Sequence, residues 1–89
     1  MTTLFVRHNV SNYKAWRKVY DEFHAVQKAK GVTAKAVYQA VDNPNDVTVW
    51  HDFETAEQAQ AFAGSATLHD AMASAGVQGA PQVWFTNPA

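Results

Sequence analysis

Hydrophobic and polar residues alternate along residues 32–53, where two runs rich in Val, Tyr, Trp and Phe are joined by the sequence DNPND at residues 42–46. β-Branched and aromatic side chains favour strands, and Asn, Pro and Asp favour turns, so this pattern predicts a β-hairpin. Similar patterns predict a first strand at residues 3–10 and a last strand at residues 82–86.

Apolar residues recur at three- and four-residue steps along residues 13–30, which is typical of a helix with one buried face. Ser11 or Asn12 supplies the N-cap side chain, and Gly31 ends the helix as a C′ glycine. The pattern therefore predicts one continuous helix between the first strand and the hairpin.

A second helical region follows the hairpin. Thr55 and Gln58 have the spacing of a capping box at its start, and the Gly-Ser pair at residues 64–65 breaks it. The short helix after the break carries four apolar residues, Leu68, Ala71, Met72 and Ala75. The second helical region is therefore predicted to be split in two.

The predicted element order is β-α-β-β-α-β in a chain of 89 residues, of which 47% are hydrophobic. A chain of this length is expected to form one small domain, residues 1–89. Because β-α-β crossovers are right-handed, the order favours one antiparallel sheet with strand order 4-1-3-2 and both helical regions on one face. The predicted fold class is α+β, with a ferredoxin-like arrangement.

Alternation also assigns strand residues to the two faces of the sheet. The helix-facing side receives mostly aliphatic residues and two histidines: Leu4, Val6, His8, Val10, Val37, Val41, Val47, Val49, His51, Val83 and Phe85. With residues 43–45 as the hairpin loop, Val41 pairs with Val47 and Tyr38 pairs with Trp50. The opposite face then carries one aromatic row across the four strands, formed by Trp84, Phe5, Trp50 and Tyr38. An apolar surface of this size usually has a partner, so the sequence predicts a homodimer through this face.

Charge and cysteine content narrow the function classes. The formal net charge is −1 and the charged residues are spread along the chain, so no nucleic-acid partner is expected. The absence of cysteine excludes a disulfide framework, a thiolate zinc site and a cysteine nucleophile. No stretch has the pattern of a signal peptide or a membrane span, so we expect a cytoplasmic protein without a membrane partner.

Histidine is the main acid–base candidate, because its unperturbed pKa lies near neutrality. The chain has four, and none of them has the spacing of a metal-ligand pair, so we expect no metal and no cofactor. His51 is expected to be structural or to lie at the rim of a pocket. His24 and His69 are expected to face solvent, with His69 close to the border of the pocket.

His8 is the predicted catalytic residue. It lies on the first strand in an otherwise aliphatic layer, where a buried polar group needs a hydrogen-bond partner. Two interpretations stay open: a structural histidine bonded to a backbone carbonyl, or a pocket base that contacts a ligand. Gln39, on the same face of the second strand, has the same two interpretations.

Trp16 and Tyr20 lie on the sheet-facing side of the first helix. They are either core residues or walls of a pocket in which they stack on a flat, conjugated ligand. Together with Gln39 and with Met72 of the last helix, they are the predicted substrate-binding residues.

Four segments resemble one known group of proteins: residues 10–16 (VSNYKAW), 42–45 (DNPN), 50–53 (WHDF) and 75–81 (AGVQGAP). They are similar to small bacterial proteins of the dimeric α+β barrel superfamily, especially the antibiotic biosynthesis monooxygenase group and proteins labelled cyclase-like. The resemblance implies a homodimer in which two sheets pack face to face. It also implies a choice among cofactor-free monooxygenases, haem-degrading enzymes, isomerases and proteins without a known activity.

The haem-degrading branch of that superfamily uses an Asn, a Trp and a His. This chain has Asn9, Trp50 and His69, but the residues around them do not match that pattern, so no haem is expected. No Ser lies in a Gly-x-Ser-x-Gly setting, so a serine nucleophile is not expected either.

Two functions therefore stay open. The first is a cofactor-free oxygenase, cyclase or isomerase that acts on a small aromatic or polyketide-like molecule, with His8 as acid or base. Its pocket would lie between sheet and helices. The second is a non-catalytic dimeric module that binds a small ligand or only dimerises. A concave cavity with convergent polar groups would favour the first function, and a space filled by large side chains would favour the second.

Overall fold

The computed structural model describes all 89 residues. Its eight elements are, in chain order, β1 (Thr2–Val10), α1 (Tyr13–Glu22), α2 (His24–Ala29), β2 (Ala34–Ala40), β3 (Asn43–Phe53), α3 (Ala56–Ala63), α4 (Ala66–Ser74) and β4 (Val77–Thr86). The predicted order of strands and helical regions is therefore confirmed, with each helical region divided in two.

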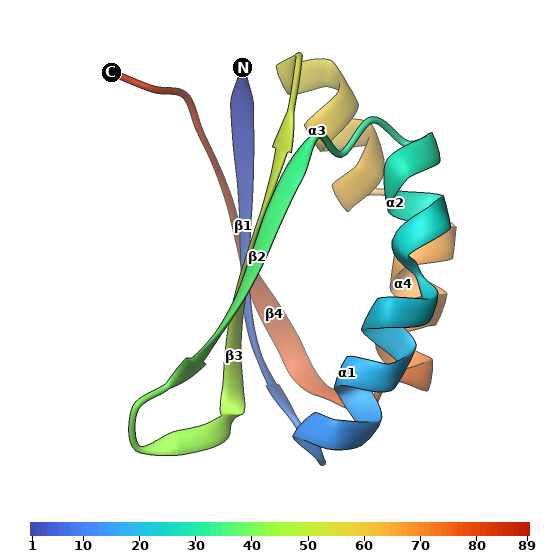
Figure 1. Cartoon of the computed structure of the whole chain (residues 1–89), viewed down its shortest axis with the longest axis vertical. Coiled ribbons are helices and arrows are strands. Elements are labelled where there is room, and N and C mark those ends of the chain that lie inside the picture. The colour runs from blue at the N-terminus through green and yellow to red at the C-terminus, as the bar shows by residue number, and fades with distance from the viewer.

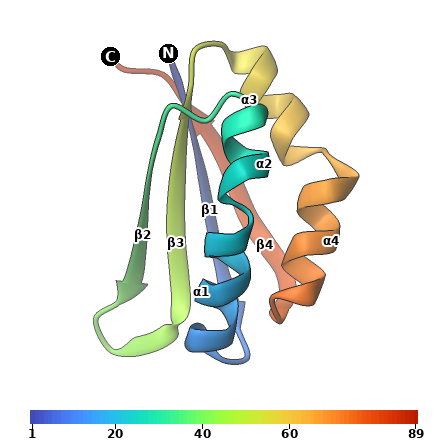
Figure 2. The ribbon, with the colours of Figure 1, turned by 45° about the vertical axis from the view of Figure 1, so that its right-hand side comes forward.

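The four strands form one antiparallel sheet in the order β2-β3-β1-β4, which confirms the predicted order 4-1-3-2. All four helices lie along one face of this sheet, and no helix covers the other face (Figure 1). Figure 2 shows α1 and α2 in line with each other, beside the pair formed by α3 and α4. This two-layer arrangement confirms the α+β, ferredoxin-like fold class. The helices are all too short or too polar to cross a membrane.

The first helical region begins at one of the two N-cap residues that the sequence predicted. Asn12 is the N-cap of α1, and its side chain accepts a bond from the backbone of the first turn at 3.0 Å. The prediction of one continuous helix over residues 13–30 is wrong at Phe23, which separates α1 from α2. The backbone N–H of Phe23 is shared between the carbonyls of Val19 and Tyr20, each at 3.1 Å, and this tightened turn interrupts the regular α-helical pattern.

Gly31 ends α2 in the predicted way. Its N–H bonds to the carbonyl of Lys28 at 3.2 Å, and the N–H of Val32 bonds to the carbonyl of Gln27 at 3.1 Å. These two bonds form a Schellman motif, which requires a left-handed residue at C′. Gly31 has a φ of 103° and satisfies this requirement without strain.

The capping box at the start of α3 is also confirmed. The Thr55 side chain accepts from the backbone N–H of Gln58 at 3.2 Å, and the Gln58 side chain accepts from the backbone N–H of Thr55 at 3.3 Å. The predicted break follows: Gly64 caps the end of α3, and the Ser65 hydroxyl caps the start of α4.

The hairpin turn lies earlier than predicted. Residues 41–42 form the turn, and β3 begins directly after it. Tyr38 consequently pairs with Thr48, and its predicted pairing with Trp50 is wrong. The predicted loop at residues 43–45 belongs to the first part of β3 instead.

Local hydrogen bonds explain this shift. The Asn43 side chain accepts from a backbone N–H two residues further on at 3.0 Å, and the Gln39 amide donates to the carbonyl of Pro44 at 3.1 Å. An irregularity in the ladder next to Gln39 absorbs the change of register. Val41, predicted to face the helices opposite Val47, lies in the turn and is fully exposed.

The shift moves the pairing by two residues, so it leaves the assignment of residues to the two faces unchanged. Nine inward strand residues are buried: Thr2, Leu4, Val6, His8, Val10, Val47, Val49, His51 and Phe53. The helices add Trp16, Tyr20, Ala59 and Phe62 to this core. On β4, the inward side chains of Val83 and Phe85 remain 43% and 41% exposed, which shows that the helices cover this edge strand incompletely.

β4 begins at Val77 rather than at the predicted Gln82. Its pairing with β1 changes register partway along: Arg7 pairs with Gln82, whereas Asn9 pairs with Gln78. One residue of β1 therefore lies opposite three residues of β4, and the longer strand bulges away.

The bulge consists of residues 79–81, and the β1 residue opposite it is His8. Gly79 has a φ of 68°, a conformation that side chains other than glycine rarely adopt. Pro81 has no N–H to contribute to a ladder, and bulges tolerate such a residue. The Gly-Ala-Pro sequence at residues 79–81 thus shapes the sheet next to His8.

The outer face of the sheet carries three aromatic residues in a row. Phe5 pairs with Trp50 on one side and with Trp84 on the other. The rings of Phe5 and Trp84 are stacked, with centroids 5.4 Å apart and planes 5° from parallel. Ala36, and not Tyr38, pairs with Trp50 on β2, so the predicted row of four is corrected to three with Tyr38 displaced along β2. No segment of the chain covers this face (Figure 1).

Candidate functional site

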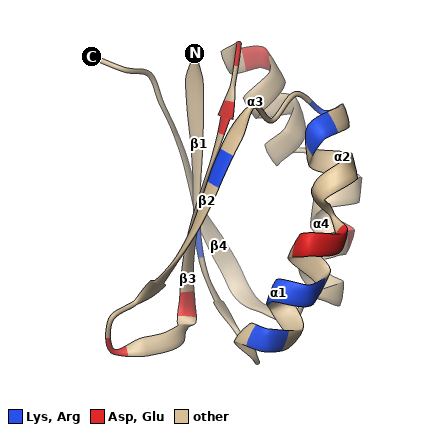
Figure 3. Cartoon of the chain, viewed as in Figure 1, with Lys and Arg blue, Asp and Glu red and all other residues tan.

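A cavity of about 520 Å³ lies between the sheet and the helices. Residues of β1, β3, β4 and all four helices line it, and 13 of the 20 lining residues are hydrophobic. This size and lining suit a small organic molecule with several rings. No Asp, Glu, Lys or Arg lines the cavity. Figure 3 shows the charged residues spread over helices and strands rather than gathered in one patch.

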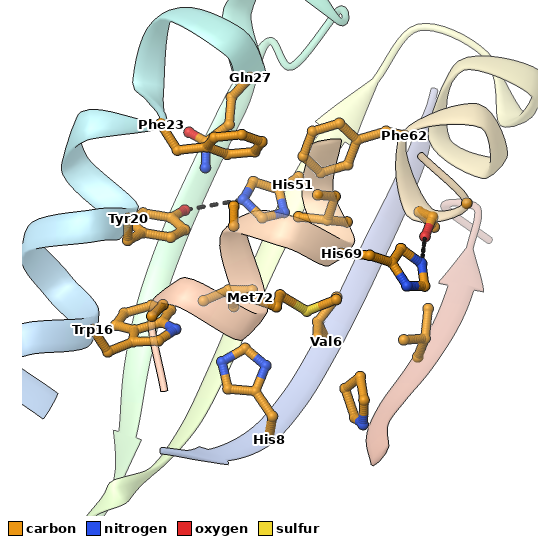
Figure 4. A pocket seen from close by; sticks show the side chains of 18 of the residues that line it. Val6, His8, Trp16, Tyr20, Phe23, Gln27, His51, Phe62, His69 and Met72 are labelled. Atoms are coloured by element: carbon orange, nitrogen blue, oxygen red, sulfur yellow. Dashed lines mark hydrogen bonds between the residues drawn. The ribbon is translucent and has the colours of Figure 1, made fainter. Parts of the chain in front are cut away.

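Four of the five predicted site residues line this cavity: His8, Trp16, Tyr20 and Met72. Figure 4 shows them converging from β1, α1 and α4. Gln39 does not belong to the lining, and its predicted place in the pocket is corrected. It is exposed near the end of the edge strand β2, where its amide bonds to the backbone of the hairpin at 3.1 Å. The strand face was predicted correctly, but the helices do not extend over that end of the hairpin (Figure 1).

One side of the cavity is a continuous aromatic wall. Trp16 and Tyr20 are stacked with centroids 4.8 Å apart, because they are four residues apart on α1. Tyr20 in turn stacks on His51 at 5.9 Å, and the edge of His51 meets Phe62 at 5.7 Å. The wall thus has fixed ring planes, against which a flat ligand can stack.

His51 lies deeper than its predicted place at a rim, since it is only 3% exposed. Its Nε2 atom and the Tyr20 hydroxyl are 3.0 Å apart (Figure 4). Burial, reinforced by the positive charge of Lys35, lowers the pKa of His51 to about 4. Burial raises the pKa of Tyr20 to about 12. At neutral pH both groups are therefore uncharged, and the Tyr20 hydroxyl keeps its proton.

Gln27 and Lys35 extend this polar cluster, and the sequence-based prediction missed both. Gln27 is 2% exposed, and its Oε1 atom accepts a bond from Nζ of Lys35 at 2.5 Å. The Lys35 ammonium also lies 5.0 Å from the centre of the Tyr20 ring. A signal for Gln27 was present: it continues the spacing of Trp16, Tyr20 and Phe23 on the apolar side of the helical region. A polar residue in that stripe indicates a buried hydrogen bond.

His8 is the most isolated polar group of the cavity. It is 7% exposed, yet neither ring nitrogen has a hydrogen-bond partner in the protein. The predicted backbone-bonded structural histidine is thus not the arrangement observed. Burial lowers the pKa of His8, and the charge of Asp46 opposes this only in part, so the ring is neutral at pH 7. An unpaired buried polar group costs about 1–3 kcal/mol, a cost that a ligand bonded to His8 would remove.

His69 lines the cavity where it opens to solvent, near the exposed Val83 and Phe85. It is exposed, as predicted, and its Nε2 atom donates to the carbonyl of Ala63 at 3.2 Å. His24 is also exposed and lies outside the cavity. No three His, Asp or Glu side chains come close enough to hold a metal ion.

The cavity can therefore accept a proton but offers no fixed charge. Its titratable side chains are His8, Tyr20, His51 and His69. Tyr20 and His51 are bonded to each other, and His69 is bonded to a backbone carbonyl. Only the neutral imidazole of His8 has both nitrogens free for a ligand.

No protein-family model matches the chain, and no curated protein is similar to it in sequence. Its fold, in contrast, is shared with solved structures of antibiotic biosynthesis monooxygenase-like proteins. One from Bordetella bronchiseptica has a TM-score of 0.83 at 16% identity, over 99% of this chain and 96% of that one. Another, from Nitrosomonas europaea, has a TM-score of 0.76 at 17% identity, over 99% of this chain and 98% of that one.

The fold is also similar to that of SnoaB, a cofactor-independent oxygenase from Streptomyces nogalater. The TM-score is 0.80 at 10% identity, over 99% of this chain and 92% of that one. These likenesses agree with the family resemblance noted in the sequence. At such identities they describe a shared fold that spans nearly the whole chain.

Proposed function

We propose that the protein is a cofactor-independent oxygenase that acts on a flat, polycyclic phenol or a related aromatic ketone. The observation that carries this proposal is the buried, neutral and unpartnered imidazole of His8 in an aromatic-walled cavity. The similarity in fold to SnoaB, a cofactor-independent oxygenase, supports the same reaction class.

The proposed reaction converts a ring CH₂ group next to an aromatic system into a carbonyl, with O₂ as the oxidant and water as the second product. His8 takes one proton from the substrate, and the resulting delocalised carbanion transfers electrons to O₂ as a carbon–oxygen bond forms. The O–O bond of the peroxide then breaks as the carbon gives up its second hydrogen as a proton, which goes to the leaving oxygen. The proton held by His8 goes to the leaving oxygen, which departs as water, so the imidazole returns to its neutral form.

The chain's contribution is to hold and deprotonate the substrate. Trp16 and Tyr20 stack on its ring system, and Met72 lines the same cavity. The apolar lining excludes water from the carbanion, which limits its reprotonation by solvent. A cyclase or isomerase reaction would begin with the same proton transfer.

A module that only dimerises is less well supported, because large side chains do not fill the space between sheet and helices. The cavity of about 520 Å³ has the size of a ligand site. We also propose a homodimer through the outer sheet face, since the row of Phe5, Trp50 and Trp84 has no cover within the chain.

Oxygen uptake with 1,8-dihydroxy-9(10H)-anthracenone tests the proposal. After subtraction of uncatalysed oxidation, wild-type protein should consume O₂, and His8→Ala should lower the rate by a factor of about 10²–10⁴. His24→Ala, which removes a histidine outside the cavity, should keep the wild-type rate.

Thermal melts of the same variants distinguish catalysis from stability. If His8→Ala is folded and still oxidises the anthracenone at the wild-type rate, His8 is not the base. If it melts several degrees lower but keeps the ligand-induced shift in melting temperature, His8 is a structural residue and the proposed role is wrong.

A further inference from the structure

Two hydrogen bonds lie at the aromatic wall of the cavity. In the first, the ammonium group of Lys35 can only donate, so Oε1 of Gln27 must be the acceptor of their 2.5 Å bond. The second joins the Tyr20 hydroxyl to Nε2 of His51, 3.0 Å away, and it is the only hydrogen bond of that hydroxyl.

The proton of the Tyr20 hydroxyl has no other acceptor in the protein, so the hydroxyl donates to Nε2 of His51. A neutral imidazole carries one proton, so with Nε2 as the acceptor the proton must be on Nδ1. The tautomer of His51 is thus set by its bond to Tyr20.

The Nδ1 atom of His51 is the other ring nitrogen, on which the proton lies. It is buried and has no hydrogen-bond partner in the protein, although the residue as a whole is 3% exposed. Figure 4 shows it on the side of the ring that faces away from Tyr20. An N–H group in that position lacks only an acceptor, and no carboxylate lines the cavity to provide one.

We propose that Tyr20 is a positioning residue that holds His51 as a hydrogen-bond donor, and that His51 Nδ1–H binds a carbonyl oxygen of the substrate. This inference rests on the proposed function for the identity of the reacting end of the substrate. It adds that the substrate carries a carbonyl group as its second polar group. As the carbanion forms and negative charge moves onto the carbonyl oxygen, the bond from His51 strengthens.

The position of His8 sets the shape of that substrate. His8 pairs with Val47 and His51 pairs with Leu4, so the two histidines are four residues apart along adjacent strands, roughly 13 Å between their backbones. A molecule that meets both must be elongated. It must also be uncharged when it binds, because no Lys or Arg lines the cavity to pair with a carboxylate or phosphate. The substrate class is therefore a neutral, elongated aromatic molecule that carries a carbonyl group at the end that meets His51.

Nitrogen NMR of histidine-labelled protein tests the tautomer directly. The ¹⁵N shifts of His51 in the wild-type protein should show a protonated Nδ1 and an unprotonated Nε2 at pH 7. Tyr20→Phe removes the hydroxyl and should move the proton toward Nε2, whereas Tyr13→Phe, a matched change on the same helix outside the cavity, should have no effect. A wild-type His51 with its proton on Nε2 overturns the proposal without any variant.

Binding of two probes of nearly the same shape, 9-fluorenone and fluorene, tests the carbonyl contact. Wild-type protein and Tyr13→Phe should bind fluorenone at least about tenfold more tightly than fluorene, as expected for one added hydrogen bond to a buried donor. Tyr20→Phe should bind both with nearly equal affinity while its circular dichroism stays that of the wild type. Equal affinities in the wild type overturn the proposal.

The two proposals fail separately. A protein that prefers fluorenone but consumes no O₂ with the anthracenone retains the carbonyl site and is not an oxygenase. A protein that consumes O₂ but does not distinguish fluorenone from fluorene retains the reaction and lacks the donor role of His51.

Discussion

The two faces of the sheet differ in how their apolar residues are covered. On the inner face, four helices cover Leu4, Val6 and Val49, and they leave a cavity beside His8 and His51. On the outer face nothing covers the stacked aromatic rings, and Trp84 is 40% exposed. The inner face thus leaves a cavity, where we propose that a small molecule binds, and the outer face leaves an aromatic row, which we propose packs on a second copy of the same sheet.

The largest expected effect is loss of the proposed dimer after a change on the outer face. Trp50→Glu places a carboxylate at one end of the aromatic row, on the central strand β3, where a dimer would have to bury it without a partner. We expect a wild-type dimer and a monomeric or insoluble variant, measured by light scattering at micromolar concentration.

The control for this change is Ala61→Glu, which adds the same charge at an exposed position on α3 and should leave the dimer intact. A wild-type protein that is monomeric at micromolar concentration contradicts the proposed homodimer.

A change of pH tests the inner face. The pKa of His51 is about 4 in the folded protein and 6.5 when unperturbed, so the unfolded chain binds a proton that the folded protein excludes between these values. Stability is therefore complete above about pH 6.5 and falls as the pH drops toward 4, by about 3 kcal/mol from His51 alone. Urea unfolding at several pH values measures this slope.

His51→Phe should flatten that slope, because the substituted side chain cannot be protonated. His69→Gln is the matched control, since His69 is exposed and its removal should leave the slope unchanged. A His51→Phe variant with the wild-type pH dependence would show that another group, such as the buried His8, accounts for the loss of stability in acid.

The smallest expected effect is a slight weakening of the proposed dimer by a change at the edge of the outer face. Tyr38 is 57% exposed and lies beyond the row of three, opposite Thr48. Tyr38→Ser should weaken the dimer by less than about tenfold, because peripheral interface residues contribute little. Trp84→Ser should weaken it more, and sedimentation at a series of concentrations compares the two. An equal effect would mean that the interface extends over the hairpin.

Sequence periodicity was sufficient to predict the sheet and its faces. Alternation along the strands and the local chemistry of Asn12, Gly31 and Thr55 identified the faces and the helix ends, because each depends on residues close together in sequence. The hairpin register was not predictable in the same way. A shift of two residues keeps every side chain on its face, so alternation cannot distinguish the turn at residues 41–42 from one at 43–45.

The site was predicted in part for a related reason. Periodicity assigns each residue to one face of its strand or helix. Four predicted residues lie in the cavity because they are on faces that point into it: His8, Trp16, Tyr20 and Met72. Gln39 has the correct face but lies beyond the end of the helices, a fact that depends on packing between distant segments. The bonds that join Lys35 to Gln27 and Tyr20 to His51 likewise depend on how α1 and α2 lie over the sheet.

The bulge of β4 at residues 79–81 has a consequence for how this scaffold can be resized. β4 is an edge strand, so a longer or shorter bulge alters one ladder only, and the pairs on both sides keep their register. Pro81 of the bulge lines the cavity together with His8. Inserting or deleting residues in this segment should therefore change the size of the molecule that fits beside His8. The stacked rings of Phe5 and Trp84 should keep their positions.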